Sequence, residues 1–298
     1  MGAAEVLLVG SSHVRSGIDP SLFARPTGVL SFAGMNIELG AAVLRAHRDL
    51  WPKLETVVVE IDEFTLLLDA VKLREDDLTH LCDRLDLSVW ELPGRADGFS
   101  RVRRSVTSIV RGDGWAALGP KHRLTLSRLR RHLIGPGRFF SEPEPTRSWA
   151  QTDSELTPER AVKRVRALQE HSVISANASE RNVAALLRLA RWLDREGIGL
   201  ALVTLPKHHT YLSQRPPEWE SMVRTGVRTV REGVDAWASE TPRSFPVPYW
   251  DLERDPRFTD AAFGDQDHLN AVGAETLAPQ LEALLAQNRT DEDGEPAT

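Results

Sequence analysis

The chain has 298 residues, of which 41% are hydrophobic, enough for one large domain or for one domain with an insertion. Its net charge of -6 excludes a generally basic nucleic-acid-binding protein, and its single cysteine, Cys82, excludes an intramolecular disulfide and a cysteine-rich zinc site. No apolar run approaches the roughly 20 residues that span a bilayer, and no basic segment precedes the first apolar run. The sequence as written therefore predicts a cytoplasmic protein, whereas a truncated N-terminus would allow association with the cell envelope.

The first 68 residues alternate between strand and helix patterns. The run that ends at Val9 is short, apolar and bounded by Gly10, as is typical of a buried strand. Strand, helix and strand at this spacing predict a parallel βαβ sheet. The predicted elements are strands at 5–9, 28–32 and 56–61, a helix at 37–49, a turn at 11–16 and a helical turn that starts at 18–20.

The middle of the chain, from about residue 70 to residue 157, shows no strand alternation. Its basic residues, from Arg95 to Arg138, are opposed over that span only by Asp97 and Asp113. We interpret it as a helical insertion that would offer a basic face to an anionic polymer or a membrane surface. The alternative is a set of solvated helix faces balanced by acidic residues elsewhere.

The α/β pattern resumes after the insertion. Pro248 cannot donate to a strand ladder, so the segment around it is predicted as an edge strand. We expect an α/β fold with a mostly parallel central sheet, formed by a single domain over residues 1–287 with an insertion at about 70–157. The predicted elements are helices at 180–197, 218–238 and 271–286, strands at 200–205 and 247–251, a loop at 206–211 and a disordered tail at 288–298.

Ser12 stands directly after the first strand, at the edge where open α/β sheets bind ligands. Its own backbone N–H would then face an oxyanion, but a serine needs a base to act as a nucleophile. His268 would supply that base, and Asp265 could fold back to the Nδ1 of the imidazole and stabilise the imidazolium. Asp267 is a rival partner, but we expect its side chain to point elsewhere. The alternatives are a tight turn with a helix N-cap at Ser12 and a surface histidine at position 268.

Taken together, two motifs resemble the SGNH (GDSL-like) hydrolase superfamily. They are Val-Leu-Leu-Val-Gly-Ser-Ser-His at residues 6–13 and Asp-x-x-His-Leu-Asn at residues 265–270. The closer likeness is to polysaccharide-associated branches, which include the alginate O-acetylation proteins and the teichoic-acid D-alanylation protein. The resemblance covers residues 1–68 and 172–286. It implies a three-layer α/β/α sandwich of flavodoxin-like type and no cofactor. It also implies a serine esterase or O-acyltransferase that acts on an acylated carbohydrate or another small ester through Ser12, His268 and Asp265.

Two further conserved motifs of that family match this sequence poorly. Where the family offers a backbone N–H after the second strand, Gly34 or Asn36 would donate here. Where the family has an asparagine after the third strand, this chain has Asp62, and an ionised carboxylate cannot donate to an oxyanion. Losing one such donor costs about 10²–10³ in rate. Four interpretations remain open. Another donor completes the oxyanion hole, the activity is weak, Asp62 points away from the oxyanion, or the protein is a non-catalytic glycan-binding or interaction protein of this fold.

His208 and His209 follow the predicted strand at 200–205 and should lie on the same rim as Ser12. They would bind substrate hydroxyls or a carboxylate, and a plain polar loop is the alternative. Adjacent histidines rarely share one ion and no third ligand is evident, so we predict no metal site. No Walker-type loop and no GxGxxG segment follows a strand, which argues against ATP and dinucleotides as ligands.

Overall fold

The computed structural model describes residues 4–31, 34–68, 156–170, 174, 176–240 and 246–293. These residues belong to one compact unit. The basic insertion expected at about 70–157 lies outside the described residues except at its last two positions, so its helical character stays a prediction. Among the described helices, none is both long enough and apolar enough to cross a membrane.

Five parallel strands form the central sheet, in the order β2-β1-β3-β4-β5. Val6 pairs with Thr27 of one neighbouring strand and with Thr56 of the other. Because helices cover both faces of the sheet, its three inner strands are almost entirely buried and apolar. This order confirms the expected flavodoxin-like α/β fold. The strands are β1 (Val6–Gly10), β2 (Thr27–Ser31), β3 (Thr56–Glu60), β4 (Gly199–Thr204) and the edge strand β5 (Tyr249–Asp251).

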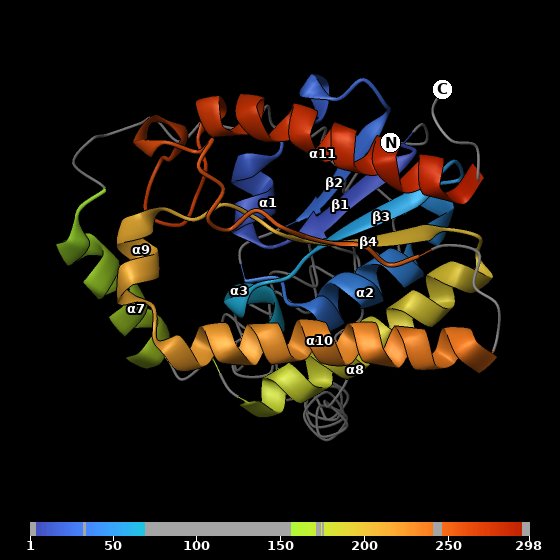
Figure 1. Cartoon of the computed structure of the whole chain (residues 1–298), viewed down its shortest axis with the longest axis horizontal. Helices are drawn as coiled ribbons and strands as arrows, with labels where there is room; N and C mark the ends of the chain where they lie inside the picture. Colours follow the sequence, from blue (N-terminus) through green and yellow to red (C-terminus); the bar gives the residue numbers. More distant parts are fainter. Residues whose placement is uncertain are drawn as a thin grey trace, which may run out of the picture. The chain divides into compact units, whose positions relative to one another are not determined.

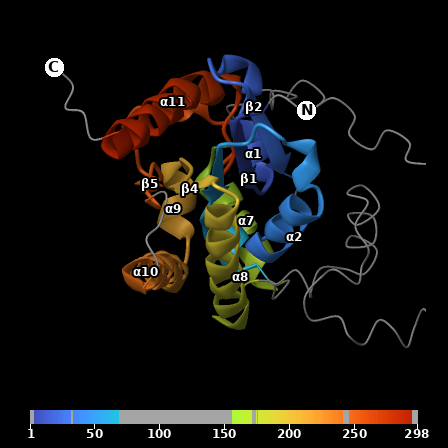
Figure 2. The same ribbon diagram turned by 90° about the vertical axis from the view of Figure 1, so that its right-hand side faces the viewer.

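Helices lie on the two faces of the sheet (Figure 1). One face carries α1 (Ser12–Gly17) and α11 (Ala271–Asp293), and the other carries α2 (Ile37–Ala46), α8 (Ala176–Arg195) and α10 (Pro217–Glu240). Figure 2 shows α11 and α10 on opposite sides of the strands. On the α11 side, Leu277 and Leu281 pack with Val6 and Leu8 of β1 in one buried apolar cluster. The three layers expected from the resemblance are therefore present.

Helices α3 and α9 follow the carboxyl ends of β3 and β4. α7 packs against α9, which places the helix that follows the insertion next to the segment that follows β4. The remaining elements are α3 (Glu63–Leu66), α7 (Pro158–Glu170) and α9 (His209–Gln214), with short 3-10 turns η1 (Pro20–Leu22), η2 (Arg48–Leu50) and η7 (Asp260–Ala262).

Several local predictions were wrong. The turn expected at 11–16 is helix α1, because the Ser11 side chain accepts a hydrogen bond from His13 N–H and caps it. The loop expected at 206–211 becomes helical at His209 because His208 caps α9 in the same way. The tail expected to be disordered from Asn288 continues as α11 to Asp293, since neither glycine nor proline occurs between Asn288 and Gly294. Helix α7 was not predicted.

Candidate active site

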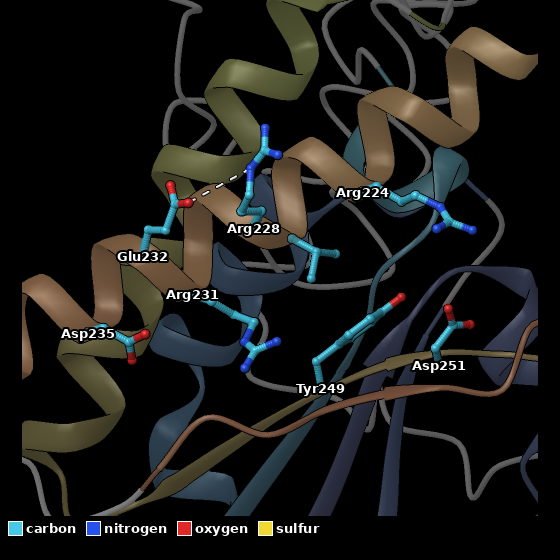
Figure 3. A pocket seen from close by; sticks show the side chains of 8 residues that line it. Arg224, Arg228, Arg231, Glu232, Asp235, Tyr249 and Asp251 are labelled. Atoms are coloured by element: carbon cyan, nitrogen blue, oxygen red, sulfur yellow. Dashed lines mark ion pairs between the residues drawn. The ribbon is translucent and has the colours of Figure 1, made fainter.

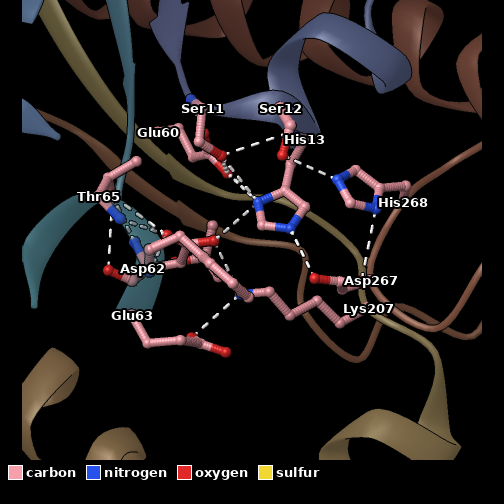
Figure 4. Close-up of polar contacts among 12 residues, drawn as sticks. Ser11, Ser12, His13, Glu60, Asp62, Glu63, Thr65, Lys207, Asp267 and His268 are labelled. Atoms are coloured by element: carbon pink, nitrogen blue, oxygen red, sulfur yellow. Dashed lines mark hydrogen bonds and ion pairs between the residues drawn. The ribbon is translucent and has the colours of Figure 1, made fainter. Parts of the chain in front are cut away.

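Ser12 and His268 meet at the carboxyl end of β1. Ser12 is the first residue of α1, and His268 lies on the loop between η7 and α11. Ser12 Oγ lies 2.8 Å from His268 Nε2 (Figure 4). This is hydrogen-bonding distance for a nucleophile and its base. The position lies next to the β1–β3 pair, where the strand order of such sheets reverses and ligands bind.

Asp265 holds the other nitrogen of His268. The Nδ1 of His268 lies 2.9 Å from Asp265 Oδ1 and 3.0 Å from Asp265 Oδ2. Asp265 Oδ1 also accepts the backbone N–H groups of Asp267 and His268, at 3.0 and 2.8 Å. This Asx turn fixes the carboxylate, and a bridge between Phe263 and Leu269 closes the loop. The structure thus brings together the three residues that the two sequence motifs singled out.

Asp267 does not point elsewhere, as the sequence led us to expect. Its Oδ1 lies 3.4 Å from His268 Nδ1, so two carboxylates face this imidazole. Burial alone would lower the pKa of His268, but Asp267 and the hydrogen bond with Asp265 raise it above its ordinary value. His13 opposes this rise because its own charge lowers the pKa of His268. The net effect stabilises the imidazolium form that His268 adopts once it has taken up a second proton.

His13 lies buried beneath the Ser12–His268 pair, with carboxylates at both of its ring nitrogens. Its Nδ1 lies 2.9 Å from Glu60 Oε1 and 3.2 Å from Asp62 Oδ2, and its Nε2 lies 3.3 Å from Asp267 Oδ2. Burial would lower the pKa of His13, but hydrogen bonds with these three carboxylates raise it well above its ordinary value. These contacts favour the imidazolium form of His13, since only that form donates from both nitrogens. Its ring centroid lies 4.7 Å from that of His268.

Asp62 is not free to face an oxyanion. It caps α3, where its Oδ1 accepts the backbone N–H groups of Phe64 and Thr65 at 2.8 and 2.9 Å. Its Oδ2 accepts from Lys207 Nζ at 2.9 Å. Burial would raise the pKa of Asp62, but Lys207 and His13 hold it far below its ordinary value. In Figure 4 the Asp62 carboxylate lies on the Lys207 side of the cluster, away from the Ser12 hydroxyl.

Further cations complete this buried cluster. Lys207 also donates to Glu63 at 3.1 Å, and both side chains are 1% exposed. Arg164, from α7, donates to Asp267 Oδ2 through Nε and Nη2 at 3.1 and 3.0 Å. Buried charges persist only when they are paired in this way. The cluster therefore connects α3, α7, the segment after β4 and the His268 loop beneath the candidate site.

Two kinds of backbone donor remain for an oxyanion. Ser12 is the first residue of α1, where an N–H group has no intrahelical partner. Gly34 has a φ of 76°, a conformation that favours glycine. Asn36 caps α2: its side chain accepts from Leu39 N–H at 3.0 Å and donates to Leu68 O at 3.1 Å. Its side chain is thus committed to structure, and only the backbone of Asn36 would serve an oxyanion.

The two histidines after β4 differ in exposure. His208 is buried, with Nδ1 2.7 Å from Thr210 Oγ1 and Nε2 3.0 Å from Asp260 Oδ1. Burial lowers the pKa of His208, and the hydrogen bond with Asp260 opposes the shift. His209 is exposed beside it. Both His208 nitrogens thus have protein partners, whereas His209 faces solvent.

Sequence reasoning missed the buried cluster. His13, Glu60 and Lys207 were not singled out, although a signal existed for Glu60. A charged residue that ends an otherwise apolar, β-branched strand is rarely buried unless it is paired. The partners themselves could not be identified, because they come from four separate parts of the chain.

A separate cavity of about 410 Å³ lies between α10 and the edge strand β5 (Figure 3). Arg228 and Glu232 form an ion pair of 3.8 Å at its wall. The lining residues are Arg224, Val227, Arg228, Arg231, Glu232, Asp235, Tyr249 and Asp251. None of them belongs to the Ser12 site.

No protein-family model matches the sequence, and no curated protein does. Among solved structures, the fold is similar to a GDSL-like lipase from Bacteroides thetaiotaomicron, with 8% identity, a TM-score of 0.40, and coverage of 95% of this chain and 87% of that one. It is also similar to a candidate acylhydrolase from Bacteroides fragilis, with 9% identity, a TM-score of 0.41, and coverage of 95% and 86%. Likeness at this level carries no argument about chemistry, which has to come from the side chains.

Proposed function

We propose that the chain is a serine-dependent hydrolase or O-acyltransferase of ester bonds, with Ser12 as nucleophile, His268 as base and Asp265 as the orienting carboxylate. The observation that supports this most strongly is the continuous contact from Ser12 Oγ to His268 Nε2, at 2.8 Å, and from His268 Nδ1 to Asp265, at 2.9 Å. Serine has little nucleophilicity unless a base takes its proton, and this arrangement supplies one.

In the proposed reaction, Ser12 Oγ attacks the ester carbonyl carbon while His268 Nε2 takes the hydroxyl proton. The resulting imidazolium is stabilised by Asp265 and passes the proton to the departing alkoxide oxygen, which leaves an acyl group on Ser12. Water or a sugar hydroxyl then attacks the acyl-enzyme, with His268 again acting as base. The nature of this second nucleophile decides between hydrolysis and acyl transfer.

The oxyanion would be held by backbone groups. Ser12 N–H is one donor, and the N–H of Gly34 or Asn36 is the second, because the Asp62 side chain is bonded to α3, Lys207 and His13. Such donors are effective because they are already oriented before charge develops on the substrate oxygen.

The substrate class proposed is an acylated carbohydrate or another small ester, following the sequence resemblance to polysaccharide-associated branches. Contact of the basic insertion with an anionic polymer or a membrane surface belongs to the same proposal. A non-catalytic glycan-binding protein was the alternative, and it was motivated by Asp62 and by the large basic insertion. The hydrogen bonds of Asp62 weaken the first of these two reasons.

A fluorophosphonate probe tests this proposal directly. We expect the probe to label the parent protein and the Ser21→Ala variant, whose serine is exposed in η1, but not Ser12→Ala. Asp265→Asn should lower kcat on activated esters by about 10⁴-fold, because the amide no longer holds the imidazole in the productive tautomer. If well-folded parent protein is not labelled and releases no acyl group from a panel of aryl esters and acetylated oligosaccharides, the proposal fails.

A further inference from the structure

Three side chains that the proposed reaction does not use converge at the surface beside α9. His208 Nε2 lies 3.0 Å from Asp260 Oδ1, and His209 Nδ1 lies 3.9 Å from the same oxygen. The two imidazole rings lie 4.1 Å apart, with an angle of 44° between their planes. His209 is 74% exposed and Asp260 is 75% exposed, so an ion could enter this cluster directly from solvent.

The spacing of these atoms suits a small divalent ion. Tetrahedral Zn²⁺ with Zn–N and Zn–O bonds of about 2.0–2.1 Å places its ligand atoms about 3.3 Å from one another. The two distances to Asp260 Oδ1, 3.0 and 3.9 Å, fall on either side of that value. Two imidazole nitrogens and one carboxylate oxygen are also a ligand set that zinc and related transition metals bind in proteins.

The Thr210 hydroxyl is placed to orient the imidazole of His208. Thr210 Oγ1 lies 2.7 Å from His208 Nδ1, and Thr210 N–H also points at that nitrogen, at 3.3 Å. In the metal-free protein, Nδ1 therefore accepts and Nε2 carries the proton that bonds Asp260. A metal ion on Nε2 would place the proton on Nδ1, where Thr210 Oγ1 accepts it in exchange for the cap hydrogen bond from Thr210 N–H. Metal-binding histidines typically have such a partner.

We propose that His208, His209 and Asp260 bind a divalent transition-metal ion, with Zn²⁺ as the best fit and water as the fourth ligand. In the sequence, the adjacent pair His208 and His209 gave no reason to expect a metal site. The structure adds the missing third ligand from η7, 51 residues beyond His209 in the sequence. The inference is independent of the Ser12 chemistry.

Binding at this site would join α9 to the segment that carries His268. Asn270, at the end of the His268 loop, donates from its backbone to Ala262 O at 3.0 Å and from its side chain to Ala261 O at 2.8 Å. His208 N–H donates to Gln266 O at 3.1 Å. An ion between His208 and Asp260 would therefore tie together two segments that already hold this loop, so its role is structural.

The test is calorimetric titration of ZnCl₂ into the metal-stripped full chain. We expect His209→Ala and Asp260→Asn each to weaken one Zn²⁺-binding event by more than about tenfold, and Thr210→Val to weaken it by about tenfold. His47→Ala, which alters a histidine between α2 and η2 ahead of β3, should bind like the parent. Zn²⁺ should also raise the Tm of the parent but not that of Asp260→Asn.

Both ligand variants alter exposed side chains, so circular dichroism should show an intact fold. Histidines elsewhere in the chain can bind additional zinc ions, and the comparison between variants separates them from this site. Visible absorption of bound Co²⁺ gives a second readout of tetrahedral coordination in the parent. The proposal is overturned if the parent binds no Zn²⁺, or if His209→Ala and Asp260→Asn bind it with the affinity of the parent.

Discussion

At the scale of single residues, the buried imidazolium of His13 is the most consequential side chain outside the proposed triad. It is the cation shared by Glu60, Asp62 and Asp267, and it is 3% exposed. Removing one partner from a buried ion pair leaves an uncompensated charge, which commonly costs about 3–5 kcal/mol. His13 therefore has a structural role that can be measured without any substrate.

We predict that His13→Gln lowers the free energy of unfolding by about 3–5 kcal/mol at pH 6. The pKa of His13 is raised in the folded protein, so its contribution is fully present below the unfolded value of about 6.5 and is lost as pH rises through the folded value. The difference between parent and variant should consequently shrink at alkaline pH. Urea unfolding at several pH values measures it.

His47→Gln is the matched control, because it changes a partly exposed histidine and should have little effect at any pH. A His13→Gln penalty that stays constant from pH 6 to pH 10 would show that His13 is not the buried cation described above.

At the scale of elements, the contact between η7 and the first turn of α11 depends on a glycine. A Cβ on Gly273 would lie 2.3 Å from Ala262 O and 2.8 Å from Leu269 Cδ2. The backbone oxygen cannot move without displacing η7, which carries Asp260. A side chain at position 273 would therefore meet backbone, which cannot yield as the end of a side chain can.

Gly273→Ala should destabilise the protein by about 1 kcal/mol or more, since overpacking of about 1–3 kcal/mol exceeds the helix-propensity gain of up to about 1 kcal/mol. Gly233→Ala on α10 is the comparison. Its new Cβ would meet the end of the Leu187 side chain at 2.9 Å, and that side chain can move. Thermal unfolding should place Gly273→Ala well below Gly233→Ala, and equal Tm values would contradict the argument.

The elements also show what a sequence can and cannot predict. The strands were predictable because their apolar, β-branched runs are buried by covering helices. α7 was overlooked because six of its 13 residues are charged, although Pro158 at its start and Ala161 and Val165 at helical spacing are helix signals; its packing on α9 is not visible in the local pattern. Ser12 and His268 were paired through the resemblance of two motifs, whereas His13 and Lys207 became paired ions only through tertiary packing.

At the scale of the whole molecule, the buried ion cluster connects parts of the chain that are distant in sequence. Lys207 comes from the segment after β4 and binds Asp62 and Glu63, which follow β3. Arg164 from α7 binds Asp267 on the loop before α11. Stability of the unit therefore depends on charge pairing as well as on the apolar core.

Lys207→Met should lower the free energy of unfolding by about 3–5 kcal/mol, because two buried carboxylates lose their shared cation. Adding Glu63→Gln to Lys207→Met should recover part of that loss, which a double-mutant cycle by urea unfolding would measure. Lys163→Met, at an exposed position of α7, is the control. If Lys207→Met is no less stable than Lys163→Met, the cluster does not stabilise the fold.

The wide separation of Ser12 and His268 has a consequence for synthesis of the protein. The two residues are 256 positions apart, and translation at about 5–20 residues per second needs roughly 13–50 s to cover that interval. During this time Ser12 has left the ribosome channel without His268, its base in the proposed reaction, and an unassisted serine reacts slowly with esters. On the proposed mechanism, the sequence separation of this pair would thus delay activation of Ser12 until all five strands of the sheet have been synthesised, since His268 follows β5.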